Sequence, residues 1–133
     1  MHVQEYMTFA DGLCRFRPRG IVSLVDGVAL ITSAIALCCA KGGTKMLVDV
    51  TGLSGYAVPT LADRFWMAQD WAHAAQGRLI LAVVALPEYI DPNKFGVRAA
   101  ADAGLKGEVF TDTAAAEAWL KANEPDAAGR STG

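Results

Sequence analysis

Residues 78–86 decide the fold class, and they have the sequence RLILAVVAL. Successive side chains of a strand point to opposite faces, and here both sets are apolar. A strand that is apolar on both faces is typical of a parallel sheet covered by helices. This stretch therefore predicts a central buried strand in an α/β protein.

The segments on both sides of this strand alternate between strand-like and helix-like patterns. Strands are predicted at 45–50 and 107–110, and helices at 59–75, 92–103 and 113–122. Strands that alternate with helices indicate a mainly parallel sheet, because each helix returns the chain to the same end of the sheet.

The first forty residues add a hairpin and one more helix. Asp11-Gly12 supplies the positive φ angles of a tight turn between strands at about 4–9 and 13–17. Ser23 and Asp26 have capping-box spacing ahead of a helix that extends to about residue 40. The expected fold is therefore an α/β sandwich with a mixed, mostly parallel sheet, an N-terminal β-hairpin at one edge and about four helices.

Length and composition limit the classes of function. The chain has 133 residues, a hydrophobic content of 53% and a formal net charge of -2. We expect one domain over residues 1–122 and a flexible tail over 123–133. No excess of cations is present to neutralise phosphates, so a nucleic-acid partner is not expected.

Three cysteines and the first residues bear on the compartment. Cys38 and Cys39 are adjacent, and bridging neighbours needs unusual geometry, so a disulfide scaffold is not expected and both are interpreted as small buried hydrophobes. Residues 1–9 contain Glu5 and no apolar run that would indicate a signal peptide. The longest apolar run is too short to span a bilayer. These observations predict a soluble, cytoplasmic protein.

Catalytic and metal-binding patterns are weak. His2 and His73 lack the spacing of metal ligands, so they are expected on the surface, with no metal and no cofactor. The candidate acids and nucleophiles have no visible base to join them; they are Asp49, Ser54, Tyr56, Asp63 and Asp91. We therefore expect a protein that is not an enzyme.

Three segments carry a resemblance to a known family. They are residues 46–53 (MLVDVTGL), 78–83 (RLILAV) and 107–120 (GEVFTDTAAAEAWL). Together they resemble the SpoIIAA-like group of STAS domains, which has the anti-sigma-factor antagonist fold. The resemblance implies a regulatory module that acts through protein contacts.

The family's phosphorylated loop is degenerate in this chain. In signalling members an Asp-Ser-Ser-Gly-Leu loop carries the modified serine at the start of a helix. Here the aspartate position holds Ala57, and the two serine positions hold Val58 and Pro59. Thr60 is the one hydroxyl at this helix start, and its spacing to Asp63 favours a helix cap over a phosphorylation site.

The helix at 59–75 carries more apolar surface than one core face needs. Leu61, Phe65, Ala68 and Trp71 form the predicted core stripe. Trp66 and Met67 lie outside this stripe. Either these side chains also find core contacts, or they form an exposed apolar patch of the kind that marks a partner or ligand surface. The candidate binding surface therefore consists of Ser54, Gly55, Tyr56, Trp66 and Met67.

Two functions fit this surface. The first is a module for protein contacts, expected to form a homodimer. The second is a carrier or sensor of a small hydrophobic, lipid-like ligand, which agrees with a loose similarity between SpoIIAA-like folds and lipid-carrying Sec14-type domains. Arg15, Arg17 and Arg19 offer a cationic stripe, which we interpret as a solvated edge that discourages further strand pairing.

Overall fold

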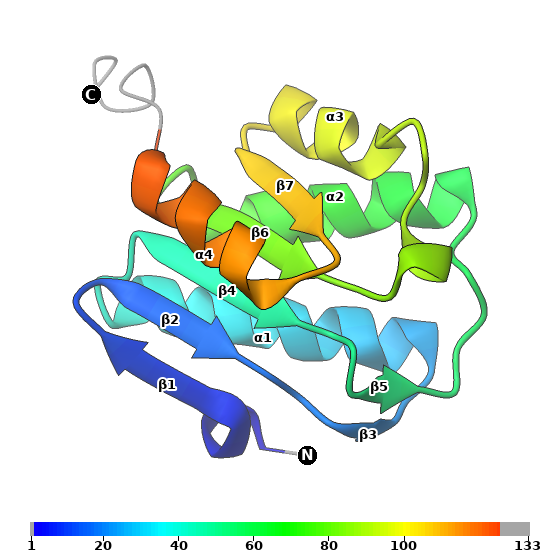
Figure 1. Ribbon diagram of the computed structural model, residues 1–133, viewed down its shortest axis with the longest axis horizontal. Helices are drawn as coiled ribbons and strands as arrows, with labels where there is room; N and C mark the ends of the chain where they lie inside the picture. The colour runs from blue at the N-terminus through cyan, green and yellow to red at the C-terminus, as the bar shows by residue number, and fades with distance from the viewer. Residues whose placement is uncertain (1, 126–133) are drawn as a thin grey trace.

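A five-stranded mixed sheet forms the centre of the protein (Figure 1). The computed structural model describes residues 2–125, so most of the predicted tail lies outside the described residues. The strands lie in the order β1-β2-β4-β6-β7. Their bounds are β1 Met7–Ala10, β2 Leu13–Phe16, β4 Lys45–Asp49, β6 Ile80–Val84 and β7 Gly107–Phe110. Only the β1–β2 pair is antiparallel, and the three other pairs are parallel, as the alternation of patterns predicts.

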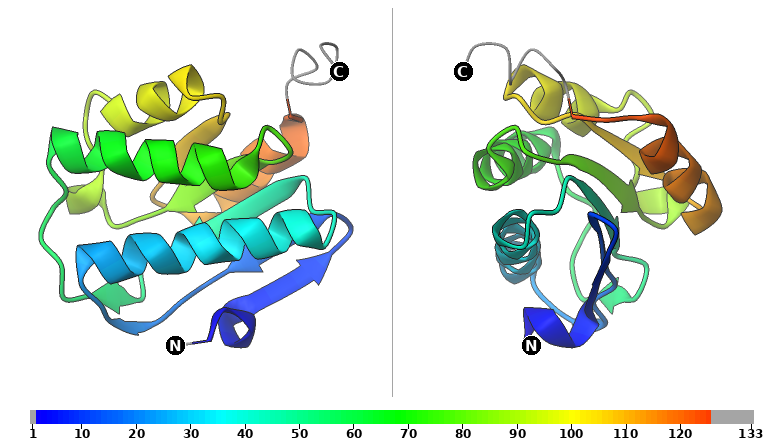
Figure 2. Two further views of the ribbon diagram at one scale, coloured as in Figure 1. Left: turned by 180° about the vertical axis from the view of Figure 1, so that it is seen from behind. Right: turned by 90° about the vertical axis from the view of Figure 1, so that its left-hand side faces the viewer.

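Four α-helices cover the two faces of this sheet. They are α1 (Leu24–Ala40), α2 (Leu61–Ala75), α3 (Phe95–Asp102) and α4 (Thr113–Ala122). From β2 to β7 the chain steps across the sheet in one direction, so right-handed connections place α1, α2 and α3 on the same side. Figure 2 shows α1 and α2 on one face and α4 on the opposite face.

Each face of the sheet has its own apolar core. The core under α1, α2 and α3 includes Phe16, Ile35 and Met46, all fully buried. The core under α4 is smaller, and Ala116 and Leu120 pack there against side chains of β4 and β6. The strand β6 contributes to both cores, which is why its sequence is apolar at every position.

Local signals in the sequence form the predicted turns and caps. Asp11 and Gly12 have φ angles of 55° and 79°, as a tight turn requires. The hydroxyl of Ser23 accepts a hydrogen bond from the amide of Asp26 at 3.1 Å and caps α1. At α2, Thr60 and Asp63 form the complete capping box, with both reciprocal hydrogen bonds present.

Short elements complete the described chain. Residues 4–6, predicted as strand, belong instead to a 3-10 helix, η1 (Val3–Tyr6). A second 3-10 helix, η2 (Pro87–Tyr89), follows β6. The segments β3 (Gly20–Ile21) and β5 (Leu53–Ser54) pair in parallel as a separate two-stranded sheet that the sequence analysis missed.

The arginine stripe is not a sheet edge. The strand β2 lies between β1 and β4, so the interpretation of Arg15, Arg17 and Arg19 as an edge device is wrong. Arg15 forms two hydrogen bonds with Glu117 of α4, Nε–Oε2 at 3.0 Å and Nη2–Oε1 at 2.7 Å. The cationic face of β2 is therefore partly covered by α4, while Arg17 and Arg19 stay exposed.

The cysteines also differ from the prediction. Cys14 and Cys38 form a disulfide between β2 and α1, and both side chains are fully buried. The expectation was based on the adjacent pair Cys38 and Cys39. Packing of α1 on the sheet instead brings Cys14 next to Cys38. Cys39 keeps a free thiol, and burial raises its pKa. The expectation of a reducing cytoplasm, which rested on the absence of disulfides, loses that support.

The predicted core stripe of α2 is correct in part. Ala68 is buried and Trp71 is half-buried, but the side chains of Leu61 and Phe65 are exposed by 56% and 51%. Both belong to the first two turns of the helix. Among residues 2–125, no helix combines the length and the apolar character that crossing a bilayer requires.

Candidate functional site

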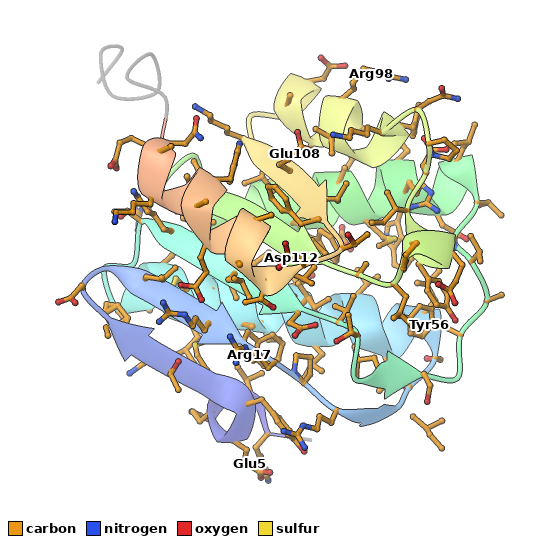
Figure 3. The ribbon with its side chains drawn as sticks, in the orientation of Figure 1. Glu5, Arg17, Tyr56, Arg98, Glu108 and Asp112 are labelled. Atoms are coloured by element: carbon orange, nitrogen blue, oxygen red, sulfur yellow. A yellow bond between two sulfur atoms is a disulfide. The ribbon has the colours of Figure 1, made fainter. Side chains whose placement is uncertain are left out.

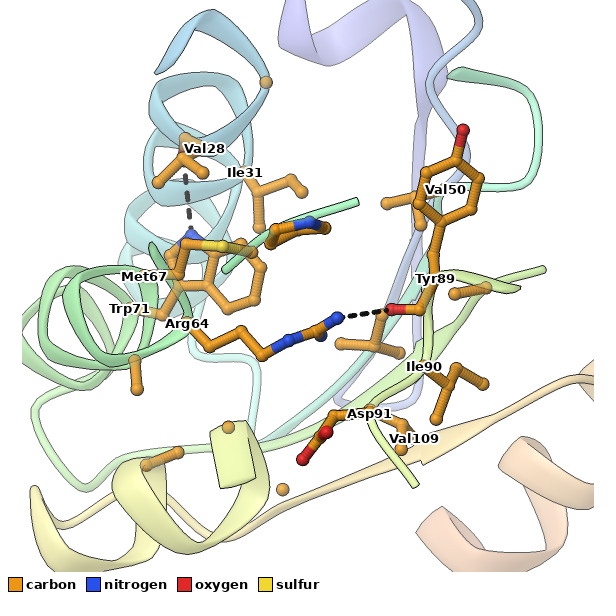
Figure 4. Close-up of a pocket in the computed structure, with 18 of the residues that line it drawn as sticks. Val28, Ile31, Val50, Arg64, Met67, Trp71, Tyr89, Ile90, Asp91 and Val109 are labelled. Carbon is orange, nitrogen blue, oxygen red and sulfur yellow. Dashed lines mark hydrogen bonds between the residues drawn. The ribbon is translucent and has the colours of Figure 1, made fainter. Parts of the chain in front are cut away.

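An apolar cavity of about 160 Å³ lies beneath the helix layer (Figure 4). Its walls come from the first half of α1, from α2 and α3, from strands β6 and β7, and from the segments that follow β4 and β6. Ligands of open α/β proteins commonly bind outside the carboxyl ends of the strands. The position of this cavity therefore makes it the candidate binding site.

Small residues leave the space that forms the cavity. Gly27 of α1, Ala68 of α2, and Gly96 and Ala100 of α3 all line it. Close packing normally leaves few voids larger than a water molecule inside a domain. Three helices that present glycine and alanine at one point cannot fill the volume above the sheet, so an open space remains there.

Large apolar side chains make the inner wall. Val28 and Ile31 face the cavity from α1, and Met67 and Trp71 face it from α2 (Figure 4). The indole Nε1 of Trp71 donates a hydrogen bond to the carbonyl oxygen of Val28 at 3.4 Å. This contact satisfies the polar atom of Trp71 and holds its ring between the two helices.

Arg64 is a charged group in this apolar setting. Its side chain extends from α2 across the cavity, and Nη2 donates a hydrogen bond to the carbonyl oxygen of Tyr89 at 3.2 Å (Figure 4). Arg64 is half-buried, and Gly96 of α3 leaves room beside its Cβ. The guanidinium therefore lies where a bound molecule would meet it.

Two tyrosines lie at the outer end of the cavity. The rings of Tyr56 and Tyr89 have centroids 5.1 Å apart and are tilted by 44°. Figure 3 shows Tyr56 beyond β5, on the connection that leads to α2. Burial, and secondarily the neighbouring Tyr89, raise the pKa of Tyr56, so its hydroxyl stays protonated at neutral pH. It therefore supplies a neutral hydrogen-bonding group.

The other charged residues of the lining have partners within the protein. Lys94 and Glu108 form an ion pair, Nζ–Oε1, at 3.1 Å. Glu108 Oε1 also accepts a hydrogen bond from the amide of Val109 at 3.0 Å. Asp91 Oδ2 accepts one from the amide of Phe95, at the start of α3, at 2.8 Å. These charges therefore stabilise the walls.

The predicted binding surface and the cavity overlap in part. Tyr56 and Met67 of that surface line the cavity, and so does Pro59 of the loop ahead of α2. Trp66 is half-buried and does not contribute to the lining. The remaining residues of the predicted surface and of the loop ahead of α2 are exposed: Ser54, Gly55, Ala57, Val58 and Thr60.

Arg64 is the site residue that sequence analysis missed. It follows Leu61 by three positions and precedes Ala68 and Trp71 by four and seven, so it belongs to the apolar stripe of the helix. A cation within a predicted core stripe was a sequence signal that could have identified Arg64. It indicates either a buried partner or a site.

The candidate catalytic carboxylates stabilise turns and caps instead. Asp49 Oδ1 accepts hydrogen bonds from the amide of Thr51 at 3.0 Å and from its hydroxyl at 2.7 Å. Asp63 belongs to the capping box of α2, and Asp91 accepts a hydrogen bond from the amide of Phe95, the first residue of α3. Within the described residues, no three histidine, cysteine or acidic side chains gather as a metal site would require.

Comparison with known proteins gives no match: no family model, no curated protein and no solved structure matches this chain. The STAS-like identity expected from the sequence therefore stays a proposal, as does every role that depends on it. The cavity and the side chains around it supply the observations for a function.

Proposed function

We propose that this chain is a non-catalytic, STAS-like binding module that holds a small apolar molecule in the cavity beneath α1, α2 and α3. The observation that carries this proposal is an open volume of about 160 Å³ with walls of valine, isoleucine, methionine and tryptophan. An apolar cavity of about 150 Å³ in another protein stays dry and binds benzene. This cavity has a similar volume, and most of the surface that lines it is apolar.

The volume also limits the ligand. Space that accommodates benzene suits an apolar group of roughly six carbon atoms. A complete long acyl chain exceeds that volume. We therefore narrow the lipid-like ligand expected from the sequence to a small aromatic or short aliphatic molecule.

The order of elements supports the STAS-like part of the proposal. The hairpin and the alternating strands and helices follow the order expected for that family, and β4 ends in Asp49 ahead of the connection to α2. In this chain Thr60 is engaged as the cap of α2. A binding role that needs no phosphorylated serine is consistent with Val58 and Pro59 at the serine positions.

Benzene titration tests the cavity. Binding to the wild-type chain, followed by chemical-shift changes in methyl groups of Val28 and Ile31, is expected to saturate. Ala68→Leu adds three carbon atoms inside the cavity and should weaken binding at least about tenfold, since it removes the space that the ligand needs. Ala118→Leu makes the same change on the exposed side of α4 and serves as the control.

Two outcomes contradict the proposal. One is the absence of saturable shifts at the cavity methyl groups of the folded wild-type chain. The other is equal binding by the wild-type chain and the Ala68→Leu variant. If Ala68→Leu does not fold, Ala100→Val adds two carbon atoms to the opposite wall and provides the same test.

Contact with a second copy of this chain is the other candidate function. The observation that favours it is the exposure by 50% or more of Val58, Leu61 and Phe65, which follow one another around the start of α2. Apolar side chains gathered in this way mark interaction surfaces. Sedimentation equilibrium should then give a dimer that Phe65→Ser weakens. Phe9→Ser, on the edge strand β1, is the matched control and should leave the dimer unchanged. A monomer at all concentrations of the wild-type chain would exclude this function.

A further inference from the structure

Arg64 indicates which small molecules the cavity selects. We infer that the site takes a monocarboxylate whose apolar part fills the cavity and whose carboxylate binds the guanidinium of Arg64. This inference rests on the proposed function, because it assigns a chemical class to a ligand of the same cavity.

The first support is the unused hydrogen-bonding capacity of Arg64. A guanidinium carries five N–H donors. Within residues 2–125, one hydrogen bond of this group is observed, from Nη2 to Tyr89, and no carboxylate lies within ion-pair distance of it. The side chain crosses a space walled mostly by apolar side chains, where an anion would interact with the guanidinium more strongly than in bulk water.

The second support is the pairing of the other charges. Lys94 and Glu108 neutralise each other, and Asp91 is engaged by the amide of Phe95. Of the two cations that line the cavity in the described part of the chain, Lys94 is paired with a carboxylate and Arg64 is not. An anionic ligand would therefore be attracted to this side chain.

The charge balance favours a carboxylate over a phosphate. The planar fork of one arginine matches the two oxygens of one carboxylate. Because Lys94 and Glu108 neutralise each other, a dianionic phosphate would meet one unpaired cation, Arg64, while the acidic Asp91 lies in the same lining. One negative charge on a flat group therefore suits the site better than two on a tetrahedral group.

Hexanoate and 1-hexanol form a matched pair of probes, since both carry a six-carbon chain and differ in charge. The wild-type chain should bind hexanoate about tenfold more tightly than 1-hexanol, as expected for a charge-assisted contact worth about 1.4 kcal/mol. Arg64→Met keeps a long apolar stem without the charge and should abolish this preference while retaining affinity for 1-hexanol. Arg78→Met, on an exposed residue outside the lining, should leave both affinities unchanged.

The outcomes separate the two proposals. If the folded wild-type chain binds 1-hexanol at the cavity but binds hexanoate no more tightly, the monocarboxylate inference is wrong and the proposed function stands. A preference retained by Arg64→Met, or tighter binding of hexyl phosphate than of hexanoate, also overturns the inference. If neither probe binds, the proposed function fails together with the inference.

Discussion

The two faces of the sheet are built differently. On the α4 face, Ala116 and Leu120 close over β4 and β6, and the Arg15–Glu117 and Lys45–Glu124 ion pairs lie around this contact. On the opposite face, α1, α2 and α3 cover the larger core but leave the cavity at one end. The contact under α4 is closely packed, whereas the opposite face is partly open.

This difference indicates where the cavity comes from. Both faces belong to one sheet and share strand β6, so the cavity does not come from poor packing of the whole domain. It follows from glycine and alanine at the helix positions above the carboxyl ends of the strands. No residue of α4 lines the cavity, so the face under α1, α2 and α3 is the better candidate for function.

A pair of leucine truncations, one on each face of the sheet, tests most directly whether the two faces are packed differently. Leu120 on the α4 face and Leu105 beside the cavity are each 1% exposed. We expect Leu120→Ala to lower the free energy of unfolding by about 4 kcal/mol and Leu105→Ala by about 2 kcal/mol, because a side chain that borders a void has fewer contacts to lose. Urea unfolding measures both; an equal or larger loss for Leu105→Ala would show that the faces pack alike.

The disulfide gives the next effect in size. Cys14 and Cys38 are separated by 24 positions and join β2 to α1, on the face that contains the cavity. Reduction should lower the free energy of unfolding by about 3 kcal/mol, because the unfolded chain loses a restraint of that loop length. Urea unfolding with and without a reductant measures this loss. Cys39→Ser serves as the control and should respond to the reductant as the wild-type chain does.

The next smaller effect is expected from the N-terminal cap of α2, which lies on the side of the sheet that contains the cavity. Thr60→Ala removes the hydroxyl that accepts a hydrogen bond from the amide of Asp63 at 3.0 Å. The expected loss in the free energy of unfolding is about 1 kcal/mol, as for other helix caps. Thr60→Ser should restore nearly all of it, and neither variant should change the affinity for benzene. A large change in affinity would assign Thr60 a role in binding.

The ion pair on the α4 face should give the smallest effect, and it should depend on pH. The hydrogen bonds from Arg15 and, to a smaller extent, its positive charge lower the pKa of Glu117 below the ordinary value of 4.5. A lowered pKa in the folded state adds stability above the ordinary value, and this stability is lost as the pH falls through the folded-state pKa. Glu117→Gln should therefore cost under about 1 kcal/mol at pH 7, since both side chains are about one-third exposed.

A pH series checks this assignment. The difference in unfolding free energy between the wild-type chain and Glu117→Gln should shrink toward zero as the pH falls below 4.5. In an Arg15→Met background, the same substitution should have almost no effect at pH 7. A difference that persists at acidic pH would mean that Glu117 stabilises α4 by something other than its charge.

Much of the fold could be predicted from short stretches of sequence. The apolar run at 78–86 contains β6, and the helix predicted at 113–122 has the observed bounds of α4. The cap formed by Thr60 and Asp63 was also predicted correctly. In each case the deciding interactions join residues a few positions apart, or depend on an alternation visible within one element.

The candidate site could be predicted only in part. The loop at 57–60 and its neighbours Tyr56 and Met67 were identified, and they belong to the cavity or its surroundings. The exposure of Leu61 and Phe65 was missed, since an apolar stripe does not reveal which of its residues the neighbouring elements cover. Arg64 was missed because its partner, Tyr89, is 25 positions away.

The sequence by itself determined the alternation of strands and helices and their approximate ends, because these depend on local periodicity and on residue types. Only the tertiary structure decided that Cys14 meets Cys38, that Arg15 meets Glu117 across 102 positions, and that three helices leave a cavity in front of Arg64. Such contacts depend on how whole elements pack in space, and no short stretch of the chain contains that information.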